Sequence, residues 1–311
     1  MPADPWLVLA AGAVEAATGY PERLHARLPH PVTWIAAALR GLETRLNRGG
    51  ALTRRLAGTA TLALVAGGGA LAGYGLDRLL AGPAWGFALA AVVGSLGLAA
   101  RNLHDHVTAV DRALSSGDLP VARAAVGRIV GRDTADLDEV GVAAAALESL
   151  AESFNDGVLA PLAWFLAGGL AGLFAYKAVN TADSLIGHRD ERYRWFGWAA
   201  ARTDDVMNVV PARLAGGLIA LAGGGGWRVM VRDAGKHASP NAGWPEAAMA
   251  GALGVRLGGP VAYDGEPHDR PVLGEGAPPT PADLRRGLAV YRRALVLAAL
   301  ALLAGGLAWP R

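Results

Sequence analysis

The 311-residue chain contains no cysteine. That absence excludes disulfide bonds, thiolate nucleophiles and cysteine-ligated zinc or iron–sulfur centres. Charge is also scarce, because Asp, Glu, Lys and Arg make up only 18% of the residues, whereas about a quarter is usual in a soluble domain. The formal net charge is +2, and no stripe of basic residues with interleaved aromatics appears, so we expect no nucleic-acid partner. The first residues lack a basic region, so we expect no cleaved signal peptide.

Long uncharged stretches are the main feature that is present. An apolar run of about 20 residues, at a rise of about 1.5 Å per residue, matches the hydrocarbon thickness of a bilayer. Four such runs in one chain favour a membrane protein over the alternative, a soluble all-α protein with alanine-rich buried helices. A fifth run is weaker because Arg213 interrupts it. The predicted spans are 56–76, 79–100, 157–176 and 294–310, together with the weaker 206–227.

The composition of the spans predicts how they pack. They are rich in alanine and glycine, which allow membrane helices to approach one another closely. We therefore predict an all-α fold, a polytopic helical bundle that forms a single integral-membrane domain over residues 1–311. Apolar residues recur about every 3.6 positions in residues 101–156, which predicts a cytoplasmic portion of amphipathic helices. Residues 228–287 are predicted to be mainly loops, and a helix is expected to start near Pro281.

Arginines predict the orientation of the bundle. Four of them precede the first span, so this side is expected to face the cytoplasm, with the protein in the inner membrane. If 157–176 crossed the bilayer completely, the basic stretch that follows it would lie outside. We therefore predict that 157–176 and 206–227 do not both cross the bilayer as ordinary spans. A broken or re-entrant helix is expected, which proteins tolerate where the backbone is buried or lines a cavity. Pro161 and the pair Gly168-Gly169 are the expected break points.

Two carboxylates and an amide stand close together after the third long run. Asp204 and Asn208 are four residues apart and share a helical face, and Asp205 lies beside them. Oxygen ligands of this kind suit a hard cation such as Mg²⁺. The alternative is a helix N-terminus at which aspartates are favoured by the helix dipole.

A second polar group has a spacing of three residues. Lys177, Asn180 and Asp183 share a face if this segment is helical. A lysine near acidic residues is typical of a phosphate or carboxylate site. The alternative is a salt-bridged helix at the membrane edge, with the lysine extended towards the headgroups.

An acidic stripe precedes the third long run. Glu148, Glu152, Asn155 and Asp156 follow one another at intervals of four, three and one. On a helix they form one face that can bind a metal ion or a substrate ammonium group. The alternative is an ordinary solvated helix face.

A dense polar loop precedes a helix of small residues expected from about Pro245. Its Lys236, His237, Ser239 and Asn241 stand just ahead of a helix N-terminus, where donors hold anions. The alternative reading of the histidine is structural. The chain has no phosphate-binding loop of the G-x-x-x-x-G-K-[ST] type, no H-E-x-x-H and no G-x-S-x-G, so any nucleotide would be held in a less common way.

At these residues the chain resembles the membrane-bound adenosylcobinamide-phosphate synthase (cobinamide synthase) family of cobalamin biosynthesis. The shorter segments at 30–32 and 128–134 fit the same family, and the match spans nearly the whole chain. Two departures are Glu15, where an aspartate is expected, and Ser153-Phe154, where small polar residues are more common. The segments that carry the resemblance read ESLAESFNDGVLAPL, AYKAVNTADSLIG, YRWFGWAAARTDDVMNVVPAR and KHASPNAGWPEAAMAGALGV.

The resemblance implies an ATP-dependent ligase. It would join adenosylcobyric acid, through a propionate carboxylate of the corrin ring, to (R)-1-aminopropan-2-ol or its O-phosphate. The expected cofactors are ATP and Mg²⁺, and the expected partners are these substrates, the lipid bilayer and other enzymes of the corrinoid pathway. The site is expected to face the cytoplasm.

The same resemblance assigns the polar residues to roles. Those expected to bind magnesium are Asp183, Asp204 and Asp205. Those expected to act in catalysis are Asp156, Glu152 and Lys177, the carboxylates as proton acceptors, with His237 as a second candidate. Those expected to bind nucleotide or substrate are Asn155, Asn180, Arg202, Asn208, Lys236, His237, Ser239 and Asn241.

Two other classes of function remain open on the sequence. A transporter or channel also has polar residues on broken membrane helices. A non-catalytic membrane scaffold of a corrinoid biosynthetic complex is the second alternative. Amide formation that consumes ATP separates the ligase from both.

Overall fold

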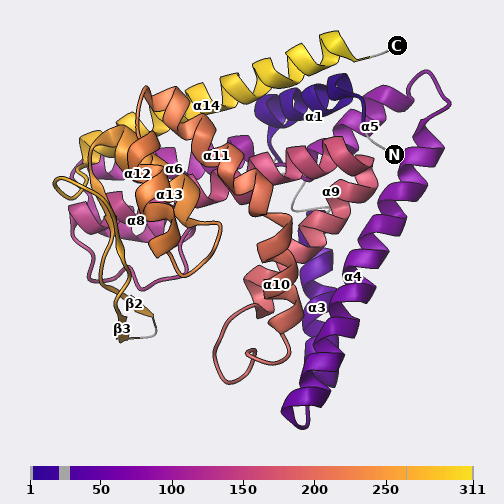
Figure 1. Cartoon of the computed structure of the whole chain (residues 1–311), viewed down its shortest axis with the longest axis horizontal. Coiled ribbons are helices and arrows are strands. Elements are labelled where there is room, and N and C mark those ends of the chain that lie inside the picture. The colour runs from indigo at the N-terminus through magenta and orange to yellow at the C-terminus, as the bar shows by residue number, and fades with distance from the viewer. Residues whose placement is uncertain (1–2, 21–28, 264, 310–311) are drawn as a thin grey trace. The chain divides into compact units, whose positions relative to one another are not determined.

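The computed structural model describes residues 3–20, 29–263 and 265–309 (Figure 1). The chain is mainly helical within these residues, and its strands there are four short ones of three residues each. The predicted all-α class is therefore confirmed. Contacts divide the chain into two compact units, a division that does not test the prediction of a single integral-membrane domain. The first unit comprises 1–99, 160–208 and 302–311, and the second comprises 100–159 and 209–301.

The first unit is built on α4 (Ala51–Leu80) and α9 (Ala160–Ile186), which lie side by side (Figure 1). A Cβ atom at Gly73 of α4 would lie 2.3 Å from the carbonyl oxygen of Leu170 in α9. Only glycine permits this approach, as expected for packing through small residues. The other helices of this unit are α1 (Pro5–Thr18), α3 (Pro31–Leu46), α5 (Gly86–Ser95) and α10 (Trp198–Met207).

Helix α9 is broken at Gly169, where φ is 64° and ψ is −156°. The N–H groups of Leu170 and Ala171 begin the second half of the helix and donate to the Asp77 carboxylate of α4, at 3.2 and 3.4 Å. Asp77 thus serves as a cap supplied by a neighbouring helix, because it satisfies donors that the break exposes. The predicted break at Gly168-Gly169 is confirmed, whereas Pro161 lies in the first turn of α9, where proline fits a helix.

Gly169→Ala is expected to lower the free energy of unfolding by about 1–3 kcal/mol, because this backbone conformation is open essentially to glycine alone. Gly168→Ala is the matched control. A Cβ atom there would meet nothing within 4 Å, and φ is not positive, so we expect little change. Thermal unfolding of both variants in detergent micelles tests this, and equal effects would contradict it.

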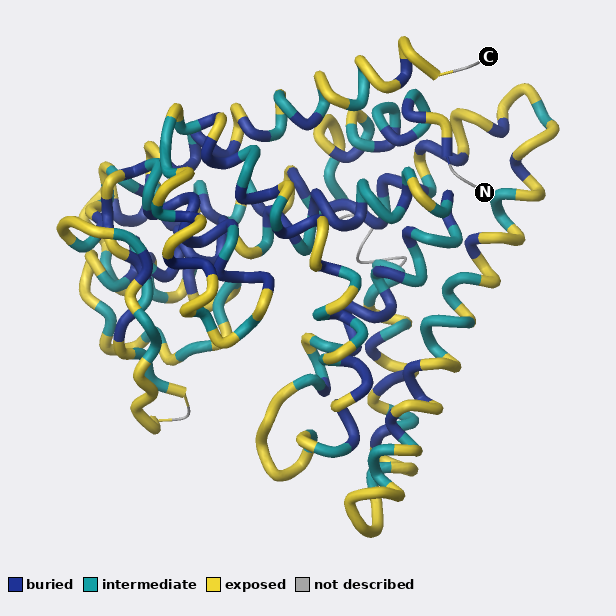
Figure 2. Tube along the Cα trace, in the orientation of Figure 1, coloured by how far each residue is buried: buried dark blue, intermediate teal, exposed yellow. Residues whose placement is uncertain are grey.

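The second unit surrounds α13 (Gly243–Leu253), most of whose residues are buried (Figure 2). Because its sequence is mainly alanine and glycine, α11 (Val209–Gly223) and α12 (Trp227–Asp233) pack closely against it. The π-helical turn η1 (Asn155–Leu159) ends α8 (Glu139–Phe154). The unit also contains α6 (Ala100–Ser115), α7 (Leu119–Val126), the 3₁₀ turn η2 (Ala234–Lys236) and residues 281–301 of α14 (Pro281–Ala308).

Two antiparallel strand pairs follow α13. β1 (Arg256–Gly258) pairs with β4 (Val272–Gly274), and β2 (Val261–Tyr263) pairs with β3 (Glu266–His268). The N–H of Gly258 donates to Glu148 at 2.7 Å, and that of Gly274 donates to Asp233 at 2.8 Å. The buried carboxylates of Glu148 and Asp233 therefore hold the β1–β4 pair against the helices.

Aspartate residues cap two helices of the second unit. Asp138 caps α8 by accepting the N–H of Gly141, and Asp118 caps α7 by accepting that of Val121. Aspartate at this position satisfies a donor that a helix leaves without an intrahelical partner. Helix α14 begins at Pro281, as expected.

Among the described residues, four helices are long and apolar enough to cross a membrane, or five if one bent pair counts as a span. The bent pair is α10 and α11, so 206–227 is not one continuous helix, in agreement with the prediction that 157–176 and 206–227 are not both ordinary spans. The uncharged run 79–100 is not one helix. Helix α4 continues to Leu80, and a turn containing Pro83 precedes α5, because proline does not continue a helix. The four candidates other than the bent pair are 51–80, 86–115, 139–186 and 281–308. The range 86–115 contains α5 and α6, and the range 139–186 contains α8, η1 and α9.

Candidate functional site

The first unit gathers carboxylates and amides from α9 and α10. Asn180 donates to Asp204 Oδ1 at 3.3 Å, and Asn208 donates to Asp204 Oδ2 at 2.9 Å. The hydroxyl of Tyr176 donates to Asn208 Oδ1 at 3.1 Å. Asn180, Asp204 and Asn208 are all buried. The predicted shared face of Asp204 and Asn208 is confirmed, and Asn180 joins them from α9.

Two further carboxylates belong to this group. Asp183 of α9 is half-buried and lies within electrostatic range of both Asp204 and Asp205. Asp205 forms an ion pair with Arg202 at 3.1 Å. We call Asn180, Asp183, Asp204, Asp205 and Asn208 the carboxylate–amide cluster.

The side-chain atoms of the carboxylate–amide cluster that could bind a metal ion are all oxygens, and oxygens are the ligands that Mg²⁺ prefers. No three Asp, Glu or His side chains of the described residues are disposed around a single metal position. An arrangement in which the carboxylates do not all face one point fits magnesium held by one or two of them, with water and phosphate filling the remaining coordination positions. The magnesium site therefore stays a prediction.

The predicted phosphate contacts of this unit are on the same elements. Lys177 lies on α9, where its carbonyl oxygen accepts the Thr181 hydroxyl at 2.6 Å. Arg202, which was expected to face phosphate, pairs with Asp205 on its own helix. These two roles also stay predictions.

The second unit contains a buried network of charges centred on Arg270. Its guanidinium lies 3.0 Å from Glu148 Oε2 and 3.3 Å from Glu246 Oε2. Arg132 is also paired with Glu148, and both glutamates are 1% exposed. Buried charges of this kind are costly unless they are paired, so Arg270 fixes the segment between β3 and β4 to α8 and α13.

Burial shifts the pKa values of both Glu246 and His237 in the direction that favours their uncharged forms. Burial, together with the negative charges of Glu152 and Glu148, raises the pKa of Glu246 well above its ordinary range. Burial, and then the positive charge of Arg270, lowers the pKa of His237. The uncharged form is thus favoured in the acid and in the imidazole, whose polar atoms lie 3.6 Å apart.

Glu246→Gln is expected to make stability less sensitive to alkaline pH. Because the pKa of Glu246 is raised, its stabilising contribution is complete below the ordinary value of 4.5 and is lost as pH rises. His237 has the opposite sign, since its lowered pKa costs stability as pH falls below 6.5. Melting temperatures between about pH 5 and 9 measure the slope. Glu266→Gln, on exposed β3, is the control. If the melting temperature depended on pH equally in the unchanged protein and in both variants, the prediction would be contradicted.

The loop before α13 uses its polar groups internally. His237 Nδ1 accepts the N–H of Ser239 at 3.0 Å, and Ser239 Oγ accepts those of Asn241 and Ala242 at 3.2 and 3.3 Å. Lys236 pairs with buried Asp233 at 2.6 Å. The N–H groups that an anion would use are therefore engaged by side chains, which favours the structural reading of His237.

The acidic stripe continues into the π-helical turn. Glu148 is buried and paired with arginines, so at this residue the stripe is not a solvated helix face. Asn155 Nδ2 donates to Asp156 Oδ1 at 2.7 Å within the turn. A π-helical turn inside a helix often accompanies a functional site. Glu152 contributes to the field at Glu246, so these acidic groups lie in the same part of the second unit.

Sequence reasoning missed three residues of the buried network, Arg132, Arg270 and Glu246. Glu246 carried a signal, because a lone acid in a run of alanine and glycine must find a partner if the run is buried. Arg270 carried none, because it lies in a loop-rich segment 24 residues from Glu246.

The family match covers most of the chain. Residues 8–291 match the family described as CobD/Cbib protein. The "Cobalamin biosynthesis protein CobD" of Rhodobacter capsulatus is 50% identical over 293 residues, which are 93% of each chain. Proteins of the same description from Sinorhizobium sp and Geobacter metallireducens are 46% and 47% identical, covering 92% and 84% of this chain and 93% and 84% of their own. No solved structure matches the chain significantly.

Proposed function

Because the chain belongs to the CobD/Cbib family of cobalamin biosynthesis, we propose that it is an ATP-dependent acid–amine ligase of that pathway. The acid would be adenosylcobyric acid, and the amine (R)-1-aminopropan-2-ol or its O-phosphate. The product is an amide, adenosylcobinamide or its phosphate. The observation that carries the proposal is the carboxylate–amide cluster, which brings Asp183, Asp204 and Asp205 within range of one another on helices that also bear Lys177 and Arg202.

The chemistry explains why an acidic cluster suits this reaction. A carboxylate does not react with an amine at neutral pH, so it must first take the γ-phosphoryl group of ATP, which releases ADP and leaves an acyl phosphate. The amine nitrogen then attacks the acyl carbon, inorganic phosphate leaves, and one proton is lost from nitrogen. Magnesium, when bound, neutralises charge on the transferring phosphoryl group.

The residues of the first unit are suited to the phosphoryl step. One or two of Asp183, Asp204 and Asp205 would hold magnesium, and the amides of Asn180 and Asn208 keep Asp204 oriented by donating to its two oxygens. An acceptor held in this way needs no reorganisation when the cation binds. Lys177 and Arg202 would face the phosphates, the latter by leaving its ion pair with Asp205.

The residues of the second unit are suited to the amine. Glu152 or Asp156 would accept the proton that the ammonium group must lose before attack. Asn155, which donates to Asp156, would orient that carboxylate. Lys236, Ser239 and Asn241 remain proposed binding residues. His237 is a weaker candidate for the base, because the lone pair on Nδ1 already accepts a backbone N–H.

Incubation of the purified protein with adenosylcobyric acid, Mg-ATP and each amine tests the proposal. We expect a corrinoid product with the mass of acid plus amine minus water, formed together with ADP and phosphate. Parallel reactions with the free and the phosphorylated amino alcohol identify the substrate. Corrinoid movement across sealed vesicles without amide formation would indicate a transporter, and neither activity would indicate a scaffold, so either outcome contradicts the proposal.

A further inference from the structure

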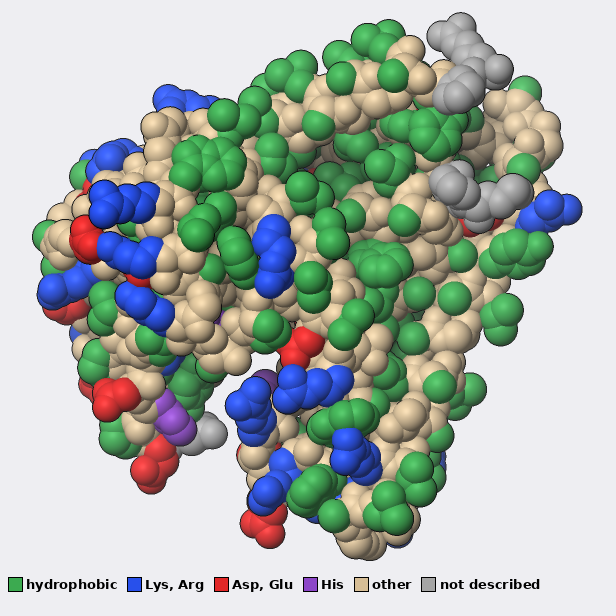
Figure 3. Space-filling model, in the orientation of Figure 1, with side chains coloured by type: hydrophobic (Ala, Val, Ile, Leu, Met, Phe, Trp, Pro, Cys, Tyr) green, Lys and Arg blue, Asp and Glu red, His purple; other side chains and the backbone are tan. Residues whose placement is uncertain are grey.

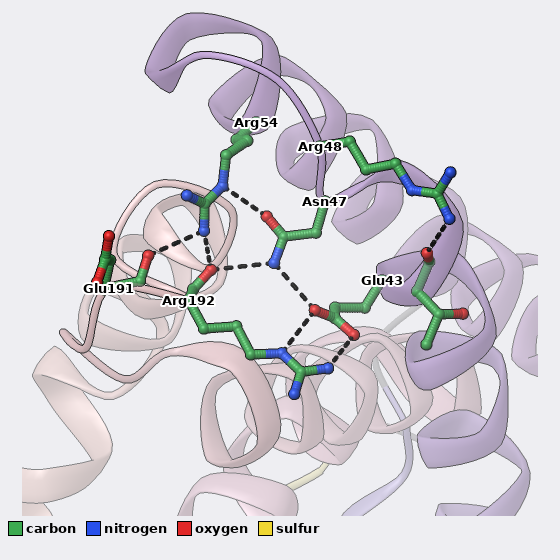
Figure 4. A pocket seen from close by; sticks show the side chains of 7 residues that line it. Glu43, Asn47, Arg48, Arg54, Glu191 and Arg192 are labelled. Carbon is green, nitrogen blue, oxygen red and sulfur yellow. Dashed lines mark hydrogen bonds and ion pairs between the residues drawn. The ribbon is translucent and has the colours of Figure 1, made fainter.

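A basic cavity lies at one end of the first unit, and its lining residues are not members of the carboxylate–amide cluster. It has a volume of about 620 Å³, within the usual range of ligand pockets, roughly 300–1,000 Å³. Figure 4 shows that it is formed where α3 meets α4 and by the segment that follows α9. Its lining residues are Glu43, Thr44, Asn47, Arg48, Arg54, Glu191 and Arg192.

Part of the lining is a closed structural network. Arg192 forms two hydrogen bonds with the buried Glu43, at 3.0 and 2.8 Å, and Asn47 donates to the same carboxylate at 2.9 Å (Figure 4). The Arg192 hydrogen bond lowers the pKa of Glu43 and so keeps it ionised. The charge of Arg192 is thus balanced by Glu43, and this pair builds the wall of the cavity.

The other two guanidinium groups keep open donors. Arg48 donates from Nη2 to the carbonyl oxygen of Thr44, and Arg54 uses Nε and Nη2 to contact Asn47 and the carbonyl oxygens of Glu191 and Arg192. Neither forms an ion pair with a carboxylate among the described residues. An arginine has five N–H donors, so both retain positive charge and donors that a phosphate oxygen can accept.

The surroundings of the cavity are strongly basic. Residues 40–55 and 187–198 together contain eight arginines and three acidic residues. Figure 3 shows Lys and Arg side chains gathered over this end. Arg45, Arg48 and Arg194 are exposed and have no carboxylate partner in the part of the chain that the structure describes. The excess of positive charge calls for an anionic ligand.

This end also lies at the boundary of two candidate membrane spans. Helix α4 begins there at Ala51, and α9 ends there at Ile186. Trp198, at the start of α10, is 39% exposed, and Arg55 stacks over its ring at 3.5 Å. Exposed tryptophan and arginine at the ends of spans are typical of the headgroup layer. A ligand in the cavity would therefore meet the bilayer surface.

We propose that the cavity lined by Arg48 and Arg54 binds the headgroup phosphate of an anionic phospholipid. The open guanidinium donors hold the phosphate, and the acyl chains lie along the apolar outer face of α4, where Leu52 and Leu56 are 70% and 62% exposed. The site is separate from the carboxylate–amide cluster and does not depend on the proposed ligase activity.

Lipid binding to the whole protein in a neutral detergent tests the proposal. The probes are dioctanoyl phosphatidylglycerol, dioctanoyl phosphatidylcholine and inorganic phosphate, with dissociation constants measured by thermophoresis. We expect phosphatidylglycerol to bind about tenfold more tightly than either of the others, because the anionic headgroup and the chains are both needed. Equal affinity for phosphatidylcholine would overturn the proposal, and so would equal affinity for inorganic phosphate.

Charge variants assign the binding to this end. The triple variant Arg45→Gln, Arg48→Gln, Arg194→Gln is expected to bind phosphatidylglycerol about tenfold more weakly, because each arginine near a membrane surface contributes to attraction. The matched control replaces three exposed arginines of the second unit, Arg128→Gln, Arg256→Gln and Arg285→Gln. Similar weakening in both variants would overturn the assignment.

A measurement on the unchanged protein keeps the proposal testable if the triple variant does not fold. Phosphatidylglycerol affinity is expected to fall steeply between about 0.05 and 0.5 M salt, because exposed charges are screened. Affinity that is independent of salt would mean that the guanidinium groups do not hold the lipid, and would overturn the proposal.

Discussion

Asp205→Asn is expected to reduce amide formation by about a hundredfold or more while the protein stays folded. The substitution removes one negative charge from the carboxylate–amide cluster and keeps the shape of the side chain. Asp205 is half-buried and forms an ion pair with the exposed Arg202, so little stability should be lost. Rates of ADP release that depend on adenosylcobyric acid and the amine provide the measurement.

The companion variant Arg202→Gln and a magnesium titration separate a magnesium role from a simple ion pair. If Asp205 served only to hold Arg202, then Arg202→Gln would cause the same loss, because each variant breaks the same contact. If Asp205 binds magnesium, raising the magnesium concentration should partly restore the Asp205→Asn rate and leave the Arg202→Gln rate unchanged. Near-normal activity of Asp205→Asn would remove this residue from the metal site.

Arg270→Met is expected to destabilise the second unit by about 3–5 kcal/mol. The variant leaves Glu148 and Glu246 buried without their shared partner, and Glu148 then depends on Arg132 and the N–H of Gly258. Removal of one member of a buried ion network costs more than the pair contributes, because the remaining charge keeps its desolvation penalty. Denaturant unfolding in detergent micelles measures the loss.

Arg256→Met is the matched control for this result. Arg256 is exposed on β1, in the same segment, and forms no ion pair among the described residues. Its loss should change the free energy of unfolding by no more than about 0.5 kcal/mol. If the two variants unfold alike, the buried charges contribute nothing and Arg270 has no special part in holding the strands.

Local features of the fold could be predicted from the sequence because each depends on neighbouring residues. Pro281 indicated a helix start, and Gly168-Gly169 indicated a break. The run 79–100 was misleading because the absence of charge concealed Pro83, which ends the helical segment. Hydropathy alone does not register such a turn, whereas the fixed φ of proline does.

The candidate site divides in the same way. The contact between Asp204 and Asn208 follows from a helical spacing of four residues and was predicted. The partnership of Arg270 with Glu148 and Glu246 was not, since it joins a loop to two helices at sequence separations of 122 and 24 residues. A buried acidic residue in a sequence predicts that a partner exists, but the sequence spacing does not identify which of the many arginines is that partner.

The cap that Asp77 provides for the second half of α9 links two positions that are otherwise unrelated. If the helix were continuous at Gly169, the Asp77 carboxylate would lose the two N–H groups that donate to it. If Asp77 were replaced, the N–H groups of Leu170 and Ala171 would lose their acceptor at the break. Each change is harmful alone and tolerable together with the other. The glycine and the aspartate should therefore be inherited as a pair, and chains of this family with a continuous helix at this point should carry an uncharged residue in place of the aspartate.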